Sequence, residues 1–365
     1  MGFQDFLGNE RVVNSLRSML AAERVPNAML FLGPRGIGKY TLALMFAQAA
    51  NCERLRDDFC GECATCRRIA RLANPVPLIE QGLAERGESA DSATVERMPL
   101  LLQTHPDVWA IVPDPIRLRS PVARPVIHMG QLRAVQRAAY FRPEGRRRVF
   151  ILDGAETMRW DWAGIFLKIL EEPPESSTLI LLAPSPFRLQ PTIVSRCLQF
   201  FFAPLAPTQM EAVLQSHAKL TPSQRARATE LAEGSPGIAL GSDIEGEYEL
   251  RLHALRILDS SANGKLPALF AQTNQLIKQQ SVPFDTLLDS LYSLLADLLE
   301  LVAAPSQPQL RNPSLRKELA AMAARVDAHW VTQAVRGVDQ LSSRTRRNIN
   351  RQLGLDAMGI SLYQR

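Results

Sequence analysis

The sequence predicts an α/β domain built on a parallel sheet, followed by an all-α region. Within residues 1–203, short stretches that are apolar throughout alternate with segments of helical pattern. Such strands are typical of a parallel sheet that helices cover on both faces. From Glu245 onward, apolar residues recur at helical spacing almost without interruption, which predicts a helical C-terminal part.

The first predicted elements are a helix, a strand and a glycine-rich loop. Apolar residues on one side predict a helix from about Asn9 to Glu23, and residues 28–32 predict a short buried strand. The loop Gly33-Pro-Arg-Gly-Ile-Gly-Lys39 follows, and a second helix begins with Thr41. This order predicts a phosphate-binding loop, in which glycines, helix N–H groups and a lysine surround an anion. A glycine-rich turn that binds nothing is the alternative.

One position of this loop departs from the pattern. A phosphate-binding loop ordinarily places a serine or threonine directly after its lysine, because that small hydroxyl holds Mg²⁺. Here the residue is Tyr40, whose phenol is far larger and whose oxygen lies several bonds further out. The pattern therefore predicts a nucleotide-site scaffold with an altered metal position, which argues against tightly bound ATP and Mg²⁺.

Four of the five cysteines lie within fifteen residues, at the spacing C-x7-C-x2-C-x2-C. Four thiolates without a histidine suit a closed structural Zn²⁺ site, in which the ion ties down an insertion too small for its own core. Because no coordination position stays open, we do not expect catalysis there. Unligated thiols or an oxidised pair are the alternatives, and the lack of an export signal favours the metal. The four candidate ligands are Cys52, Cys60, Cys63 and Cys66.

The next stretch is less regular. Residues 71–104 are rich in proline, glycine and serine, which predicts a loop-rich insertion with one short helix near Thr94 to Leu102. We expect His105 to be a loop residue and residues 108–112 to form a strand. Residues 125–140 predict a strand end and a helix, and a basic cluster then follows, which we expect to be a solvated turn rather than a DNA-binding patch. Its members are Arg142, Arg146, Arg147 and Arg148.

Val149-Phe-Ile-Leu-Asp153 predicts the second strand of a nucleotide site, whose terminal aspartate reaches Mg²⁺. In hydrolysing proteins of this kind a glutamate follows the aspartate and polarises the attacking water. Here the residue is Gly154, which cannot act as a base, and we expect Glu156 to point elsewhere. The candidate nucleotide-contacting residues are Gly33, Gly36, Gly38, Lys39, Thr41 and Asp153.

The later elements are predicted mainly by apolar pattern. A helix ends at Pro173, residues 178–183 form a buried strand, and two helices run from Thr208 to Ala218 and from Pro222 to Glu233. We expect Cys197 to be a packing residue, because no histidine lies near it in the sequence. A long helix carries leucines that we expect to be buried in a helical bundle: Leu287, Leu288, Leu291, Leu294, Leu295, Leu298 and Leu299.

Composition limits the class of protein. The chain has 365 residues, of which 46% are hydrophobic and 22% charged, which is typical of globular domains. No apolar run reaches the about 18 residues of a membrane span, and the N-terminus lacks a signal pattern, so we expect a cytoplasmic chain without membrane contact. The net charge of +5 permits contact with nucleic acid but does not argue for it.

Four motifs together resemble the bacterial DNA polymerase III clamp loader, within the AAA+ group. They are the glycine loop, the four-cysteine insert directly after its helix, Leu167-Lys-Ile-Leu-Glu-Glu-Pro-Pro174, and Ser195-Arg-Cys-Leu-Gln-Phe200. The resemblance covers about residues 1–243 well, and the remainder only in its helical type. It implies an AAA+ P-loop domain over residues 1–203, a small helical lid over 204–243, and a helical collar for oligomerisation over 244–365.

The family contains two similar kinds of subunit. In the family that the sequence resembles, gamma/tau motor subunits bind and hydrolyse ATP, whereas the delta-prime subunit has the same fold with a decayed nucleotide site. This chain departs from the motor pattern at Tyr40, at Gly154, and at Gly237, where the motor has an arginine that senses the γ-phosphate. The strand end Ala183-Pro-Ser185 also lacks a threonine or asparagine sensor. The resemblance therefore implies a delta-prime-like subunit without independent ATP hydrolysis.

Arg196 of the Ser-Arg-Cys motif is intact. In the family this arginine touches the γ-phosphate in a neighbour's site, as an arginine finger given in trans; a surface salt bridge is the alternative. The resemblance further implies as partners the gamma/tau and delta subunits, the sliding clamp and primed DNA. DNA contact should be to phosphates, because loading must work on any sequence.

No polymerase active site is visible in the sequence, so a polymerase activity would belong only to the complex. Two other functions stay open. One is an ATP-hydrolysing motor subunit of the gamma/tau type with unusual motifs. The other is a different P-loop machine, such as a nucleotide kinase or a DNA-repair ATPase, although such proteins have no reason to carry a four-cysteine insert beside Ser-Arg-Cys.

Overall fold

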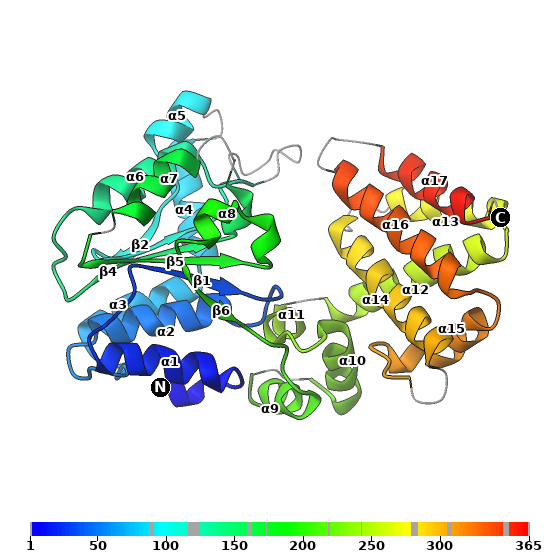
Figure 1. Cartoon of the computed structure of the whole chain (residues 1–365), viewed down its shortest axis with the longest axis horizontal. Helices are drawn as coiled ribbons and strands as arrows, with labels where there is room; N and C mark the ends of the chain where they lie inside the picture. The colour runs from blue at the N-terminus through cyan, green and yellow to red at the C-terminus, as the bar shows by residue number, and fades with distance from the viewer. Residues whose placement is uncertain are drawn as a thin grey trace. The chain divides into compact units, whose positions relative to one another are not determined.

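The computed structural model describes residues 2–87, 91–115, 125–158, 163–172, 174–217, 220–241, 243–278, 284–304, 308–345 and 350–363. Contacts group the chain into two compact units (Figure 1). The first contains Met1–Gln209 and Ser235–Gly237, and the second contains Met210–Gly234 and Ile238–Arg365. The division of the second part into lid and collar stays a prediction.

The first unit alternates strands with helices, as the apolar pattern predicts. Its strands are β1 (Ala28–Leu32), β2 (Leu102–His105), β3 (Val108–Ile111), β4 (Arg148–Asp153), β5 (Ser177–Ala183) and β6 (Leu198–Phe201). Its helices are α1 (Glu10–Ala21), α2 (Lys39–Asn51), α3 (Ala64–Ala70), α4 (Val76–Arg86), α5 (Ser92–Arg97), α6 (Met129–Ala139), α7 (Ala163–Glu171) and α8 (Pro191–Val194). Pro173, predicted to end α7, lies outside the described residues.

The six strands form one sheet in the order β2-β3-β4-β5-β1-β6. The five strands from β3 to β6 pair in parallel, and Leu30 at the centre of β1 lies opposite Leu181 of β5 and Gln199 of β6. The predicted parallel sheet is therefore confirmed. The antiparallel edge strand β2, which pairs with β3, was not predicted.

Alternate residues of each strand enter two separate cores. Met29 and Phe31 face a core shared with α1 and α2, whereas Leu30 and Leu32 face a core shared with α6 and α7. Figure 1 shows these helices on opposite sides of the sheet. Because successive side chains of a strand point to opposite faces, a strand covered on both sides must be apolar throughout.

The second unit is helical. The remaining helices of the chain are α9 (Pro207–His217), α10 (Pro222–Ala232), α11 (Pro236–Gly241), α12 (Ile244–Ala262), α13 (Leu266–Lys278), α14 (Phe284–Ala303), α15 (Arg316–Ala323), α16 (Ala328–Thr345) and α17 (Arg351–Tyr363). The predicted leucine stripe of α14 is buried in a shared core, with the exception of Leu299, which is 43% exposed.

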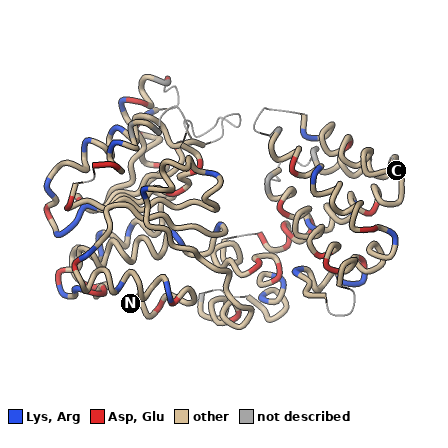
Figure 2. The backbone as a smooth tube through the Cα atoms, in the orientation of Figure 1, with Lys and Arg blue, Asp and Glu red and all other residues tan. Residues whose placement is uncertain are grey.

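Charged residues are spread over the helices and loops of each unit, whereas the strands of the sheet carry few (Figure 2). Among the described residues, no helix is long and apolar enough to cross a membrane.

The insertion over residues 71–104 is more ordered than its composition predicts. It contains the helix α4, which begins directly after Pro75, as well as α5, whose first turn is capped by Asp91. The predicted helix over Thr94 to Leu102 is wrong at its C-terminal end, because α5 ends at Arg97 and Leu102 begins β2.

A buried ion pair explains why this insertion is ordered. Arg86, the last residue of α4, donates two hydrogen bonds to the carboxylate of Asp114, at 2.9 and 2.6 Å, and both side chains are almost fully buried. A two-pronged contact of this kind fixes the end of α4 against the segment after β3. Pairs between residues so far apart in the chain leave no local sequence pattern.

The basic cluster after Tyr140 is only in part the solvated turn that we expect: Arg142 and Arg146 are exposed, whereas Arg147 is half-buried and Arg148 is buried. Arg147 donates to the carbonyls of Ser177 and Glu175, and Arg146 donates to the carbonyls of Ala49, Cys52 and Leu55. These contacts hold the start of β5 and the cysteine-rich segment. Arg146 and Arg147 are therefore tied to the main chain of their own unit.

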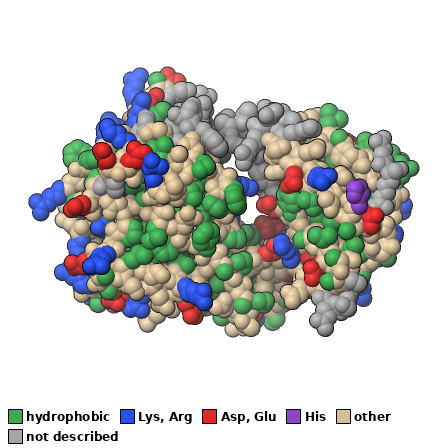
Figure 3. Space-filling view, in the orientation of Figure 1, with side chains coloured by type: hydrophobic (Ala, Val, Ile, Leu, Met, Phe, Trp, Pro, Cys, Tyr) green, Lys and Arg blue, Asp and Glu red, His purple; other side chains and the backbone are tan. Residues whose placement is uncertain are grey.

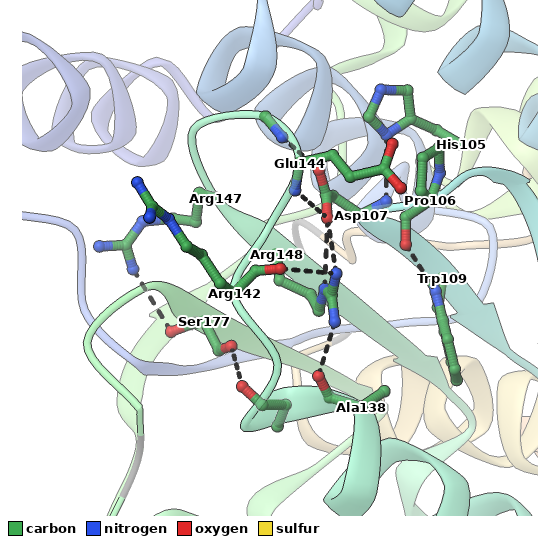
Figure 4. A network of polar contacts seen from close by, with 12 residues as sticks. His105, Pro106, Asp107, Trp109, Ala138, Arg142, Glu144, Arg147, Arg148 and Ser177 are labelled. Atoms are coloured by element: carbon green, nitrogen blue, oxygen red, sulfur yellow. Dashed lines mark hydrogen bonds and ion pairs between the residues drawn. The ribbon is translucent and has the colours of Figure 1, made fainter.

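Arg148 lies in a buried network at the N-terminal end of β3 and β4 (Figure 4). Its guanidinium donates to Asp107 at 2.9 Å and to the carbonyl of Ala138 at 2.8 Å. The Asp107 carboxylate also accepts from the N–H groups of Glu144 and Gly145. His105, expected to be a loop residue, is instead a buried residue at the end of β2, and its Nδ1 accepts from the Asp107 N–H at 3.2 Å.

The substitution Asp107→Ala is expected to lower the free energy of unfolding by about 3 to 5 kcal/mol, because it leaves the buried Arg148 charge without its partner. Denaturant unfolding followed by tryptophan fluorescence measures the change. Arg54→Ala is the control, because it breaks the exposed pair with Glu62 and should leave stability almost unchanged. Equal losses for both variants would contradict the assignment of Asp107 as the centre of the network.

Candidate functional site

The glycine loop between β1 and α2 has the conformation that its glycines predict. Gly33, Gly36 and Gly38 have φ angles of 153°, 70° and 100°, which residues with a side chain rarely adopt. Lys39 begins α2 and is buried, and its ammonium donates to the carbonyls of Gly33 at 2.6 Å and Pro34 at 2.7 Å. The lysine side chain thus binds main-chain carbonyls of its own loop. Thr41 is exposed.

Other segments of the first unit lie directly against this loop. A Cβ atom added to Gly33 would meet the carbonyl of Phe202 at 2.8 Å, and one added to Gly38 would meet the Phe6 ring at 3.0 Å. The N–H of Gly237 donates to the carbonyl of Gly36 at 2.8 Å. A Cβ added to Gly237 would lie 2.9 Å from that same oxygen, so an arginine at this position would not fit here.

Tyr40 has a structural contact in place of the metal hydroxyl. Its phenol donates to the carbonyl of Leu72 at 2.9 Å, and its ring packs against the core below the sheet. Burial, with Asp153 nearby, raises the pKa of Tyr40 well above its usual range, so the phenol keeps its proton and remains a donor. The side chain joins α2 to the insertion that follows the cysteines.

Asp153 at the end of β4 lies near Lys39, as the second-strand pattern predicts. Burial raises the pKa of the Asp153 carboxyl, and the Lys39 charge acts in the opposite direction. Burial lowers the pKa of Lys39, while Asp153 and Glu156 act to raise it. The structure therefore brings Lys39 and Asp153 together at the C-terminal edge of the sheet, where ligands of α/β proteins bind.

The backbone after Asp153 does not accommodate a glutamate. Gly154 has φ 73°, and a Cβ there would lie 2.9 Å from the ring of Pro113. Together with the engaged hydroxyl of Tyr40, this geometry does not fit a hydrolytic Mg²⁺–nucleotide site.

Glu156 lies closer to the site than we expected. A turn of 3-10 helix over Ala155–Thr157 follows Gly154, and the charges of both Asp153 and Lys39 act on Glu156. Burial raises the pKa of its carboxyl, and its Oε2 has no hydrogen-bond partner among the described residues. The direction in which the Glu156 side chain points stays a prediction, although the charges of the site act on its carboxyl. The tight turn at Gly154 reverses the chain, and its positive φ angle was not foreseen.

The four predicted zinc ligands are brought together between α2 and α3. The Sγ atoms of Cys52, Cys60, Cys63 and Cys66 all lie within 4.8 Å of one another, and none forms a disulfide. Four sulfurs around one Zn²⁺ at about 2.3 Å would lie roughly 3.8 Å apart, so the cluster fits a tetrahedral ion. The donor set therefore suits Zn²⁺, which would act there as a structural cross-link.

Main-chain N–H groups support the sulfur atoms. Cys63 N donates to Cys60 Sγ at 3.3 Å, and Cys66 N donates to Cys63 Sγ at 3.4 Å. Such bonds lower the pKa of Cys60 to about 6, whereas burial raises the pKa of the Cys66 thiol. Gln48 of α2 donates to the Cys66 carbonyl at 3.0 Å, and Arg146 donates to the Cys52 carbonyl. The sequence analysis did not identify Gln48, and it named Arg146 without foreseeing this contact.

Arg196 lies just after α8, and its side chain is 36% exposed. Its Nη1 donates to the carbonyl of Thr192 at 3.0 Å, and its Nη2 donates to Glu171 Oε1 at 2.8 Å. The two motifs Leu-Lys-Ile-Leu-Glu-Glu and Ser-Arg-Cys therefore meet in space. Cys197 is buried, and burial raises its pKa to about 12, which suits a packing residue.

The polar groups at the strand end after β5 have partners in neighbouring loops. Ala183 O accepts from Gly33 N at 3.3 Å, and Ser185 Oγ accepts from the N–H of Phe187 to begin a short turn. On the face drawn in Figure 3, basic and acidic side chains of the described residues are interspersed, without one continuous basic patch.

Comparison with known protein families finds a match over the first unit. A sequence model of the family described as DNA polymerase III, delta subunit, matches residues 8–206. This range is most of the first unit, and it ends where α9 begins.

Individual relatives carry related names. The DNA polymerase III subunit tau/gamma of Haemophilus influenzae is 30% identical over 209 residues, which are 57% of this chain and 25% of that protein. The subunit tau of Escherichia coli is 28% identical over 214 residues, which are 58% of this chain and 27% of that protein. The matched segment thus spans only about a quarter of the length of these relatives.

Solved structures of related name are more distant. The crystal structure of a DNA polymerase III gamma subunit-related protein from Thermotoga maritima has a TM-score of 0.45 and 15% identity, with 97% of this chain and 99% of that chain covered. The clamp loader delta protein of Bacillus subtilis has a TM-score of 0.29 and 12% identity, with 97% and 100% covered.

The cysteine cluster is expected to hold one Zn²⁺ per chain, measured by elemental analysis of protein purified without added metal. Cys63→Ser should lose the ion and lower the midpoint of thermal unfolding, because the metal contributes to folding of the module. Cys197→Ser should keep the ion, since Cys197 lies outside the cluster. Unchanged zinc content in Cys63→Ser would contradict the assignment.

Any residue other than glycine at position 154 is expected to destabilise the protein. Gly154→Ala should lower the free energy of unfolding by about 1 to 3 kcal/mol, because it forces a left-handed backbone and a contact with Pro113. The matched control is Gly164→Ala in α7, where a Cβ meets nothing within 4 Å and alanine favours the helix. The prediction is wrong if denaturant unfolding gives the two variants the same stability.

Proposed function

The chain belongs to the DNA polymerase III delta subunit family, and we propose that it is a clamp-loader subunit of the delta-prime type. In this proposal it helps to load a sliding clamp onto primed DNA during replication. It does not hydrolyse ATP itself, and it supplies an arginine to the nucleotide site of a neighbouring motor subunit.

The observation that carries the proposal is the backbone at Gly154. A catalytic glutamate directly after the strand aspartate would have to adopt φ 73° and overlap Pro113. A glutamate could therefore not simply replace Gly154, because the local fold has no space for its side chain. Glu156 has a charge near Lys39, yet it belongs to a different turn of the chain, so it does not take the place of a residue that directly follows Asp153.

The phosphate loop supports the same conclusion. Lys39 already uses its ammonium to bind two carbonyls, and Tyr40 uses its hydroxyl to bind Leu72. A phosphate would have to compete for Lys39, and the hydroxyl that would hold Mg²⁺ points to another partner. Gly237, where a motor has its sensing arginine, lies against Gly36 with no space for a longer side chain.

Arg196 is the residue that would act on a neighbour. A guanidinium is planar and permanently charged, and it suits a phosphoryl group. An arginine finger supplied in trans can contribute about 10³ to 10⁵ in rate in other P-loop enzymes. Arg196 is partly exposed and is held by main-chain and side-chain contacts at the end of α8, so its guanidinium is accessible to a partner.

The remaining parts of the proposal concern the assembly. We expect partnership with gamma/tau and delta subunits, with contacts to the clamp and to DNA phosphates, in the cytoplasm. We expect residues 204–243 to act as a lid and residues 244–365 as a collar that holds the assembly together. The chain would then be a component of a DNA-directed DNA polymerase holoenzyme without being its polymerase.

A second function is an ATP-hydrolysing motor subunit of the gamma/tau type. Two observations favour it: the relatives described above are named tau and gamma, and Lys39 and Asp153 lie together as in a nucleotide site. The positions Tyr40, Gly154 and Gly237 argue against it.

ATP turnover in a reconstituted loader separates the two functions. The chain is combined with the motor and delta subunits of its own organism, the clamp and primed DNA, and compared with Arg196→Ala and Lys39→Ala. Arg196→Ala is expected to lower turnover sharply, by up to about 10³-fold at the site it serves. Lys39→Ala is expected to leave turnover unchanged, because no hydrolysis occurs at this chain's own loop.

The isolated chain gives the control. If it hydrolyses ATP and Lys39→Ala removes that activity, the chain is a motor and the proposal fails. Assembly of each variant into the loader is measured by gel filtration, so that a loss of rate is not confused with a loss of binding.

A further inference from the structure

The contacts of Arg196 leave part of its guanidinium free. A guanidinium has five N–H groups, and the bonds to Thr192 O and Glu171 Oε1 use two of them. The other three can donate to a phosphate. The side chain is also 36% exposed, so a partner can reach it.

The backbone that carries the Glu171 carboxylate is anchored in the core. It is the last residue of α7, and the two residues before it, Ile169 and Leu170, are buried in the core on that face of the sheet. The N–H of Glu172 continues the helical pattern with a bond to the Lys168 carbonyl at 3.1 Å. Because α7 also packs against α8, the backbone segments that carry Glu171 and Arg196 lie in contact with each other.

The position of Glu171 is unfavourable for α7 itself. An acidic side chain at the C-terminal end of a helix is disfavoured by the helix dipole. The pair with Arg196 offsets this, but pairs between exposed side chains contribute little to folding. With Glu171 52% and Arg196 36% exposed, the stability of the chain gives no sufficient reason for this pair.

We propose that Glu171 is a positioning residue for Arg196, which holds the guanidinium so that its free N–H groups face the nucleotide phosphate of a neighbouring subunit. The inference rests on the proposed function of Arg196. A long side chain that is already held in place loses less conformational entropy when it contacts a partner. Correct orientation of a catalytic group is also a general source of rate acceleration in enzymes. Glu171 does not touch the phosphate and acts only through Arg196.

The test uses the complete loader with clamp and primed DNA, with Glu171→Ala, Glu171→Gln, Glu172→Ala and Arg196→Ala measured in one series over a range of ATP concentrations. Glu171→Ala is expected to lower kcat by about fivefold to tenfold, since freeing the arginine costs part of its rotamer freedom. KM for ATP should not change, because the neighbour's own loop holds the nucleotide. Glu171→Gln keeps an acceptor oxygen for Nη2 and should recover most of the rate.

Glu172→Ala is the matched control. Glu172 follows Glu171 directly and is also exposed, but Arg196 forms its ion pair with Glu171, so the removal of the Glu172 side chain should leave kcat unchanged. Equal losses in Glu171→Ala and Glu172→Ala would overturn the inference, as would a wild-type or faster rate in Glu171→Ala. Failure of Glu171→Ala to assemble, with Glu171→Gln assembling normally, would also overturn it, since Glu171 would then serve binding.

The same series separates this inference from the proposed function. A full rate in Arg196→Ala means that the proposed function of Arg196 is wrong. A slow Arg196→Ala beside a wild-type Glu171→Ala leaves that function intact and removes only the role of Glu171.

Discussion

The close approach of three backbone segments at the phosphate loop is the constraint on which the first unit depends. Gly33 lies against Phe202 after β6, Gly36 against Gly237, and Gly38 against the Phe6 ring. A Cβ atom at Gly33 or Gly237 would overlap the facing carbonyl, and one at Gly38 would be tight against the Phe6 ring. Two of these contacts join the loop to distant parts of the chain. Lys39 then binds the loop's own carbonyls. The conformation that would hold a phosphate is thus maintained by the packing of the protein.

The same packing explains the altered site residues. Tyr40 replaces a metal-binding hydroxyl, yet its phenol joins α2 to the segment after the cysteine cluster through Leu72. A hydrogen bond of this kind contributes about 0.5 to 1.5 kcal/mol, which is a useful gain for an insertion with little core of its own. Gln48 and Arg146 bind the cysteine-rich segment in the same way. The residues that depart from a catalytic pattern therefore support the fold.

Local pattern predicted the parts of the molecule that local physics determines. The apolar strands, the glycine loop, the clustered cysteines and the leucine-rich helix α14 depend on residues near one another in sequence. The order of α4 and the internal contacts of Arg146 and Arg148 depend on partners tens of residues away. The position of Glu156 depends on a positive φ angle at Gly154, and glycine alone does not reveal which angle it adopts.

Arg196 differs in its contacts and exposure from the residues of the chain's own nucleotide loop and its surroundings. Lys39, Tyr40, Gly154 and Gly237 each have a contact within the unit that accounts for their presence. Arg196 is partly exposed, its partner Glu171 is more exposed still, and a pair of this kind adds little to folding. Two contacts hold this guanidinium, and the proposed function gives it a role at the nucleotide site of a neighbouring subunit. The proposed subunit thus combines a loop lysine that binds its own main-chain carbonyls with an arginine that acts on a neighbour.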